Sequence, residues 1–338
     1  MDIHHKRKDI NSSTIELEIT IPKDSFTKSY NTILDREAKT FQIKGFRKGA
    51  VPRELVEKSL KDQVLQEVFE RIAPVYTAQA ITVENIDIVA PPAYKEIEPV
   101  DINKDITFKV DITIMPTFKI GDLKKIKVDT KEVKVEDKEI DEIIEQFNKQ
   151  SGTKIKSGSK KWIEMVAKQI GKEDIKDMDT LKAELKKLLK EQKDNIVKKE
   201  NESSALKQAI ELSKIEIPQN AIQFEAYERE NNFMKTLEQR KIALDAFLKA
   251  NDLTVEVMRE MWNKDAKEAL ETDLFLRTYA VENKLDITDE ELQKEIEEIK
   301  KGNPNSSHNY DDKQWQEYIK RVLVKEKAFK NFIEKVIK

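Results

Sequence analysis

The sequence predicts an α+β domain, in which helices pack on an antiparallel sheet, followed by a mostly α-helical region with long arms. Three observations predict this multidomain, elongated fold. Residues 13–21 and 106–114 alternate apolar and polar side chains, which is typical of half-buried strands. Residues 177–338 carry apolar side chains at helical spacing almost without interruption. Charged residues make up 38% of the chain, well above the usual quarter, which indicates long exposed helical faces.

The composition argues against several classes of function. The chain has 338 residues, a net charge of −3 and no cysteine, so we expect two or three domains and no cysteine-based catalytic or metal site. Of its three histidines, His4 and His5 are expected in a disordered tail and His308 in a polar loop. No segment approaches the length of a membrane span, and residues 1–10 lack the apolar core of a signal peptide. We therefore expect a cytoplasmic protein that uses no cofactor, metal ion or membrane.

Residues 1–115 are predicted to form the α+β domain, because the order of segments is strand, helices, strands. Pro22 ends the first strand, and Asp24 or Ser25 is suited to cap the helix after it. Pro74 predicts a kink in the longest helix of this domain. We expect strands at 13–21, 86–89, 93–97 and 106–114. We expect helices at 24–39, from Pro52, and over 62–83, the last of which should bury Val64, Leu65, Val68, Phe69, Ile72, Val75 and Tyr76.

Residues 116–159 are predicted to form an extended linker that contains one helix. The stretch up to about residue 135 is rich in Lys and Asp and has little to bury, whereas apolar residues recur at helical spacing over 136–150. The segment Ser151–Ser159 is rich in Gly, Ser and Lys, which is typical of a short flexible connector.

Residues 160–338 are predicted to be helical. Pro218 interrupts the apolar pattern and should open a new helix, whose apolar stripe includes Tyr227 and runs to Leu248. A turn is expected at Asn251. Thr288 and Glu291 have the spacing of a capping box, in which each residue caps the backbone of the other. We expect the helices to begin near residues 179, 218, 254 and 288, with a last one after 311.

The stretch Phe41–Pro52 stands out because two of only seven glycines, Gly45 and Gly49, lie four residues apart in it. Glycine permits positive φ, so these two residues favour a tight loop that displays one aromatic and two basic side chains between them. The window 36–58 holds seven basic residues and three acidic ones. Such a loop suits an anionic partner with an apolar notch, although a plain solvated turn between two helices is the simpler interpretation.

The string Gly45-Phe46-Arg47-Lys48-Gly49, with Pro52 after it, resembles the ribosome-binding loop of the trigger factor family, bacterial chaperones that receive nascent chains. The order and spacing of segments in 1–115 resemble the N-terminal domain of that family as well. A basic residue is common in the family at the position of Ala50, and its absence here should weaken the electrostatic part of binding. The resemblance implies that the following residues dock on a ribosomal protein and adjacent RNA near the tunnel exit: Lys44, Gly45, Phe46, Arg47, Lys48, Gly49 and Pro52.

The resemblance also implies that a domain is missing. In the family an FKBP-like prolyl isomerase domain is inserted after the linker helix, where this chain has only Ser151–Ser159. Such a domain needs roughly a hundred residues with their own strands and pocket. No catalytic constellation is visible elsewhere, so we expect no enzyme. Whether the short form is natural or an engineered deletion stays open.

The order of helices and breaks in 160–338 resembles the C-terminal domain of the family, whose two helical arms frame a cradle for unfolded chains. Methionine and aromatic side chains adapt to many shapes and suit a binder of mixed sequences. Each of these residues can equally be ordinary helix packing. The candidate client-binding residues are Phe233, Met234, Met258, Met261 and Trp262.

Together these observations predict an ATP-independent chaperone whose partners are the ribosome and unfolded or nascent polypeptides. A homodimer off the ribosome stays open. The alternatives are an RNA-binding or ribosome-assembly factor that uses the basic loop alone, an exported chaperone with similar helical architecture, and a chaperone that retains prolyl isomerase activity.

Overall fold

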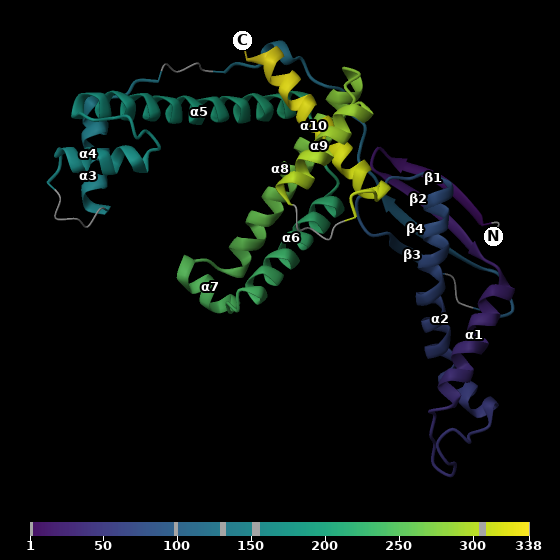
Figure 1. The fold of residues 1–338 in the computed structure, drawn as a ribbon. Coiled ribbons are helices and arrows are strands. Elements are labelled where there is room, and N and C mark those ends of the chain that lie inside the picture. Colours follow the sequence, from purple (N-terminus) through teal and green to yellow (C-terminus); the bar gives the residue numbers. More distant parts are fainter. Residues whose placement is uncertain (1–2, 98–100, 129–132, 151–155, 304–308, 338) are drawn as a thin grey trace. The chain divides into compact units, whose positions relative to one another are not determined.

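The computed structural model describes residues 3–97, 101–128, 133–150, 156–303 and 309–337 (Figure 1). Contacts between residues divide the chain into two units, Met1–Lys119 with Ile215–Leu274, and Ile120–Lys214 with Phe275–Lys338. A small antiparallel sheet with helices near the N-terminus and a mostly helical remainder confirm the predicted fold class. The boundaries at 115 and 159 stay predictions.

The sheet has four antiparallel strands in the order β1-β2-β4-β3. Their bounds are β1 His4–Asn11, β2 Thr14–Ile21, β3 Ala93–Ile97 and β4 Ile106–Thr113. The expectation of a disordered tail at His4 and His5 is wrong, because both residues lie in β1. The strand escaped sequence reasoning since its residues are almost all exposed and therefore show no apolar alternation. The strand expected at 86–89 is reduced to a single bridge between Ile88 and Ile114.

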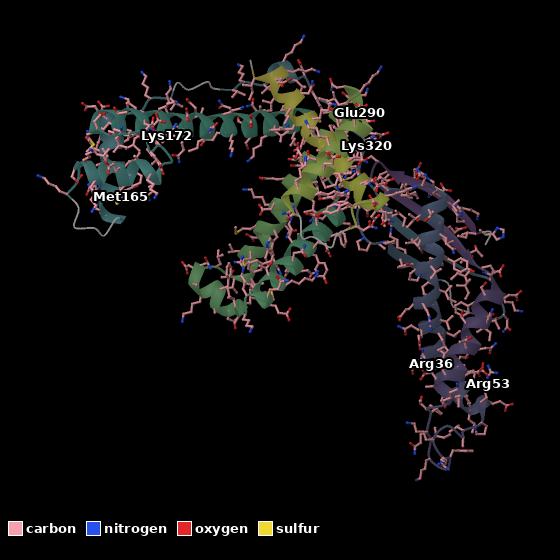
Figure 2. All side chains as sticks on the ribbon, in the orientation of Figure 1. Arg36, Arg53, Met165, Lys172, Glu290 and Lys320 are labelled. Carbon is pink, nitrogen blue, oxygen red and sulfur yellow. The ribbon has the colours of Figure 1, made fainter. Side chains whose placement is uncertain are left out.

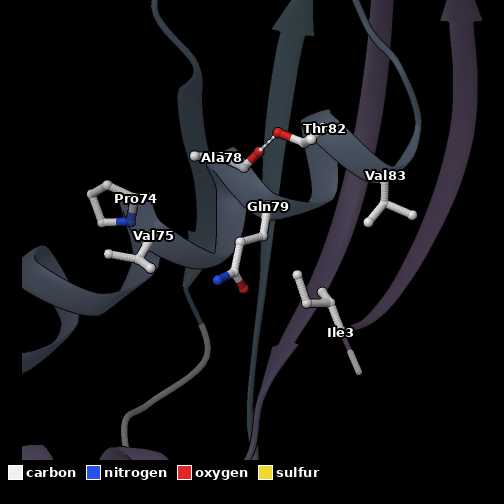
Figure 3. A pocket seen from close by; sticks show the side chains of 7 residues that line it. All are labelled: Ile3, Pro74, Val75, Ala78, Gln79, Thr82 and Val83. Carbon is white, nitrogen blue, oxygen red and sulfur yellow. Dashed lines mark hydrogen bonds between the residues drawn. The ribbon is translucent and has the colours of Figure 1, made fainter. Parts of the chain in front are cut away.

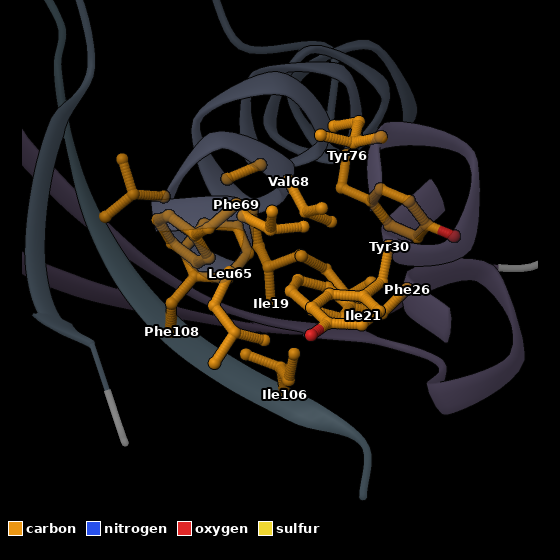
Figure 4. Close-up of a cluster of buried hydrophobic side chains, with 14 of the residues drawn as sticks. Ile19, Ile21, Phe26, Tyr30, Leu65, Val68, Phe69, Tyr76, Ile106 and Phe108 are labelled. Carbon is orange, nitrogen blue, oxygen red and sulfur yellow. The ribbon is translucent and has the colours of Figure 1, made fainter. Parts of the chain in front are cut away.

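One face of the sheet packs against α1 (Lys23–Ala38) and α2 (Arg53–Val83). Figure 4 shows the resulting core, in which the β2 residues Ile19 and Ile21 lie among aromatic side chains of both helices. The rings of Phe69 on α2 and Phe108 on β4 meet edge to face, 5.3 Å between centroids. The core is therefore built from alternate residues of the strands and one stripe of each helix.

Three details of these helices differ from expectation. Pro22 occupies the N-cap of α1, one residue before its first turn, so neither Asp24 nor Ser25 caps it. The two helices expected after residue 52 form one continuous helix, because nothing in the intervening Lys61-Asp62 breaks it. Pro74 lies inside this helix, and the kink expected there stays a prediction. Val75 is 52% exposed rather than buried.

In the other unit, three helices form a small separate core. They are α3 (Asp137–Gln150), α4 (Lys160–Gln169) and the start of α5 (Met178–Ser213), preceded by a short 3₁₀ turn, η1 (Leu123–Lys125). Trp162 is fully buried among apolar side chains of all three helices. Of the predicted connector, residues 151–155 lie outside the described residues, and Ser159 caps α4 by accepting from the Trp162 N–H.

The remaining helices are α6 (Gln219–Gln239), α7 (Leu244–Asn251), α8 (Val255–Glu282), α9 (Asp289–Gly302) and α10 (Lys313–Val336). The predicted capping box is confirmed: the Thr288 hydroxyl accepts from the Glu291 N–H at 3.2 Å, and the Glu291 carboxylate accepts from the Thr288 N–H at 2.9 Å. The sequence predicts a helix from Pro218 to Leu248, whereas the helix after Pro218 ends at Gln239 and α7 follows separately.

Candidate functional site

The loop between α1 and α2 is held in one shape by its glycines. Gly45 and Gly49 adopt positive φ values of +96° and +75°. The Gly49 N–H donates to the Phe41 carbonyl at 3.0 Å. A Cβ at Gly49 would lie 2.7 Å from the Lys39 carbonyl oxygen, whereas a Cβ at Gly45 would meet nothing within 4 Å. Gly49 is therefore required both by φ and by space, and Gly45 by φ alone.

The base of this loop is anchored in the core. Phe41 and Ile43 pack partly buried against it on one side, and Val51 is buried on the other. The hydroxyl of Tyr30 on α1 donates to the Glu57 carboxylate on α2 at 3.2 Å. Burial, with the adjacent Glu57 carboxylate, raises the pKa of Tyr30 to about 12. The two helices that carry the loop are thus joined close to its base.

The tip of the loop is exposed and basic. Phe46 is 40% exposed, and Lys44, Arg47 and Lys48 are exposed beside it. Within the described part of the chain these three cations form no ion pair. The positive charge at the tip is therefore not neutralised within the chain.

Two arginines on the flanking helices differ from the cations at the tip, because they have partners. The Arg36 guanidinium lies 2.7 Å from a Glu67 carboxylate oxygen, and the Arg53 side chain bonds Asn31 at 2.5 Å. Figure 2 labels both arginines on this helical pair. Of the basic residues in the window 36–58, those at the tip are therefore more available to a partner than these two arginines.

The candidate client-binding residues lie on the helical hairpin of α6, α7 and α8, and the structure divides them into two groups. The Phe233 ring on α6 packs against Phe247 on α7 and Trp262 on α8, with centroid distances of 5.0 and 5.6 Å. Met258 is only 7% exposed. Phe233, Met258 and Trp262 thus contribute to the inside of the hairpin.

Met234 and Met261, in contrast, are 40% and 51% exposed. Further exposed apolar side chains share the hairpin, and sequence reasoning missed them: Phe224, Ile242 and Val257. Tyr227, expected in the inner stripe, is exposed. Spacings of three and seven residues place Phe224, Tyr227 and Met234 on one side of α6, away from Ile222 and Phe233. The spacing of Phe224, Tyr227 and Met234 is visible in the sequence and could have indicated this second apolar side of α6.

No other kind of site is evident in the described residues. No group of three or more His, Asp or Glu side chains there lies close enough to bind a metal ion. No helix among them is long and apolar enough to cross a membrane. Burial raises the pKa of Glu271 on α8, but its neighbour Lys267, 3.7 Å away, is one helical turn earlier on the same surface. This arrangement is an ordinary helix ion pair rather than an acid–base pair.

Two family models match this chain. The model described as "Bacterial trigger factor protein (TF)" matches residues 1–147, and that described as "Bacterial trigger factor protein (TF) C-terminus" matches residues 177–334. The first covers the sheet, the loop between α1 and α2, and nearly all of α3. The second covers all of α5 and the hairpin. The matches are thus collinear with the two candidate sites.

Curated relatives named trigger factor agree with this assignment. The protein of Staphylococcus epidermidis is 22% identical over 373 aligned residues, covering 84% of this chain and 86% of the relative. That of Carboxydothermus hydrogenoformans is 21% identical, covering 87% and 89%. That of Tolumonas auensis is 31% identical over 134 residues, covering 40% and 30%.

A solved structure shows the same fold. Its title is "Promiscuous Substrate Recognition in Folding and Assembly Activities of the Trigger Factor Chaperone". The match covers 99% of this chain and 100% of the solved chain, with a TM-score of 0.54 and 16% sequence identity. The fold, the two collinear family models and the relatives together show that the chain belongs to the trigger factor family of bacterial chaperones.

Proposed function

We propose that this chaperone binds the ribosome near the exit of the nascent-chain tunnel through the loop between α1 and α2, and shields apolar segments of newly made polypeptides without ATP. One observation carries the proposal: the tip of that loop exposes Phe46 beside Lys44, Arg47 and Lys48, on a base fixed in the core. Membership of the trigger factor family supports this role for the loop. The cytoplasm is the compartment that contains such a partner.

The chemistry of the tip suits a mixed surface of ribosomal protein and RNA. Arg47 and Lys48 can contact RNA phosphates, and each such contact releases counterions, so binding should weaken as salt rises. Phe46 adds apolar area that suits a notch on a protein surface. Because the loop is already shaped by Gly45 and Gly49, little conformational entropy is lost when it docks.

The exposed side chains of the α6–α8 hairpin suit the second partner, an unfolded polypeptide. Met234 and Met261 can change rotamer to follow different client side chains. Each contact contributes little, on the order of 25 cal/mol per Å² of buried apolar surface, and ordering the client offsets part of it. Binding at any one place should therefore be weak and reversible, and stronger when one client occupies several places.

The proposal includes no prolyl isomerase activity. Neither family model matches residues 148–176, the stretch where an isomerase domain is inserted in the family. The alignment with the Staphylococcus epidermidis protein spans 373 positions, more than the 338 residues of this chain. That relative therefore contains residues with no counterpart here. A rate of prolyl isomerisation on a short peptide above the uncatalysed rate would contradict this part of the proposal.

Co-sedimentation with 70S ribosomes tests the proposal. The variant Phe46→Ala/Arg47→Ala/Lys48→Ala should no longer co-sediment, because it removes the aromatic and both cations while leaving the glycines and the core in place. A matched control with one aromatic and two cations removed from the hairpin, Phe224→Ala/Lys235→Ala/Lys241→Ala, should co-sediment like the wild type. Unchanged binding of the loop variant would remove the central claim. A protein that binds ribosomes but no unfolded client would instead be an RNA-binding or assembly factor.

A further inference from the structure

The strand β1 lies at an edge of the sheet. One side of β1 pairs with β2 from His4 opposite Thr20 to Asn11 opposite Thr14, and no described strand pairs with its other side. The pairing is regular from His4 to Asp9 and shifts only near the hairpin turn. An edge strand presents unpaired backbone N–H and C=O groups that can pair with an extended chain.

The end of the helix α2 lies over the sheet face at this edge. His5 lies opposite Ile19, so it shares the sheet face that α2 covers, and its imidazole Nε2 lies 2.7 Å from the Glu84 carboxylate at the end of α2. Beyond this contact, Val75 and Val83 on the outer side of α2 are 52% and 67% exposed. A strand added outside β1 would therefore have a helical surface above one of its faces.

A groove occupies this place. It has a volume of about 680 Å³ and is bounded by α2 and the start of the sheet edge, as Figure 3 shows. The described residues that form its walls carry no charge: Ile3, Pro74, Val75, Ala78, Gln79, Thr82 and Val83. Apolar side chains that project from one face of an added strand would enter this groove and cover exposed valine surface.

The groove also contains a polar atom without a partner among the described residues. The side-chain oxygen Oε1 of Gln79 is shielded from solvent and accepts no hydrogen bond from them. In Figure 3 the Gln79 side chain points into the space between Val75 and Ile3. A buried acceptor without a partner costs free energy, and a backbone N–H or a hydroxyl of a bound segment would satisfy it.

The charge of β1 selects among occupants. The strand contains three consecutive cations, Lys6, Arg7 and Lys8, and one acidic residue, Asp9. Like charges placed opposite each other in adjacent strands are destabilising, so antiparallel pairing of β1 with β1 of a second copy is disfavoured. Lys6 and Lys8 lie on the sheet face away from α2, where Lys6 also pairs with Glu18, so acidic side chains on that face of an added strand would meet them favourably. Arg7 instead shares the face of His5 and pairs with Asp9 and Glu84. The site therefore suits an added strand with apolar side chains on the face toward the groove and acidic side chains on the opposite face.

We infer that β1 and the groove beside α2 form a β-addition site for an extended segment of an unfolded polypeptide that alternates apolar and acidic residues. The inference rests on the proposed client-binding function and adds a second place of client contact, chemically distinct from the methionine-bearing hairpin. Backbone pairing supplies affinity without regard to sequence, and the groove and cations supply the preference.

Fluorescence anisotropy with a labelled peptide tests the inference. The peptide alternates Val and Glu over eight residues, the length of β1, and a second peptide has the same composition with the valines adjacent. The alternating peptide should bind more tightly than the other. Val75→Gln/Val83→Gln should weaken its binding by at least about tenfold, because two polar side chains replace the groove's exposed valines without changing the charge. The matched control Val281→Gln, an exposed valine on α8, should bind like the wild type.

Backbone pairing is tested by methylating alternate amides of the same peptide. Only every second amide of an added strand faces the edge, so N-methylation of one alternate set should abolish binding and that of the other set should leave it nearly unchanged. Equal binding of the two methylated peptides, or of the alternating and rearranged ones, would overturn the inference. So would self-association, measured by analytical ultracentrifugation, that the groove variant abolishes, because a second copy would then be the occupant. Circular dichroism confirms that each variant folds. Ribosome co-sedimentation and suppression of client aggregation are measured separately, so a failure of the proposed function is distinguishable from a failure of this site.

Discussion

The side-chain amide of Gln208 on α5 forms two hydrogen bonds with the backbone of Lys127. Its oxygen accepts from the Lys127 N–H at 3.0 Å, and its nitrogen donates to the Lys127 carbonyl at 2.8 Å. The amide thus satisfies both backbone polar groups of Lys127, as a neighbouring strand would do. Nearby, the Gly121 N–H donates to the Ser213 hydroxyl at 3.0 Å, and a Cβ at Gly121 would lie 2.4 Å from the Leu212 carbonyl oxygen. The linker before α3 is therefore fixed to the C-terminal part of α5.

Replacing Gln208 should release this segment. Gln208→Ala removes both hydrogen bonds, and Gln208→Glu removes the donor while keeping the size, so both should lower the free energy of unfolding by about 1 kcal/mol. Hydrogen–deuterium exchange should show faster exchange of the Lys127 amide in Gln208→Ala. The control Gln223→Ala, at an exposed helical position on α6, should leave this exchange unchanged. Unaltered protection of Lys127 in Gln208→Ala would mean that the amide does not hold the linker.

The two loop glycines should differ in their tolerance of alanine. Gly49→Ala combines a positive φ with a contact of 2.7 Å to backbone, whereas Gly45→Ala meets only the cost of positive φ, roughly 1 kcal/mol. We expect Gly49→Ala to lower thermal stability and ribosome co-sedimentation more than Gly45→Ala. Gly302→Ala is the control, because its φ is not positive and its surroundings are empty. Equal effects of the Gly45 and Gly49 substitutions would show that the backbone at Lys39 moves aside.

Sequence reasoning succeeded where one residue type has one physical use. Two glycines four residues apart predicted the loop between α1 and α2, and the Thr288 and Glu291 pair predicted the start of α9. It failed where burial decides. Strand β1 has no buried face, so its sequence carries no alternation. The sequence wrongly predicts Val75 and Tyr227 to be buried, because α2 and α6 carry apolar residues on two faces and spacing alone does not tell which face is covered.

The methionines of the hairpin should separate stability from client binding. Met258→Ala leaves a cavity inside the hairpin and should cost about 2–5 kcal/mol of stability. Met234→Ser/Met261→Ser changes exposed side chains and should cost little stability, but it should reduce suppression of aggregation of a chemically unfolded protein. Light scattering without nucleotide measures the suppression, and denaturant unfolding measures the stability. If Met234→Ser/Met261→Ser suppresses aggregation as well as the wild type, clients do not contact these methionines.

The small core at the start of α5 should depend on pH through its ion pairs with α3. Lys186 lies 2.8 Å from Asp137 and Lys193 lies 2.6 Å from Glu139, and these lysines hold the pKa of both carboxyls below their usual values. The Glu136 N–H, which donates to Glu139, acts in the same direction.

A carboxyl group whose pKa is depressed in the folded state stabilises that state above its unfolded pKa, and this contribution is lost as pH falls through the folded pKa. The unfolded values are about 3.9 for Asp and 4.3 for Glu, so α3 should loosen from α5 only below about pH 4. NMR titration of the Asp137 carboxyl should show its pKa rise toward the ordinary value in Lys186→Met, and not in the neighbouring control Lys187→Met. Because the pair is exposed, added salt should produce a similar rise in the wild type. If the Asp137 pKa is the same in Lys186→Met and the wild type, the ion pair between Lys186 and Asp137 does not form in solution and does not help to hold α3.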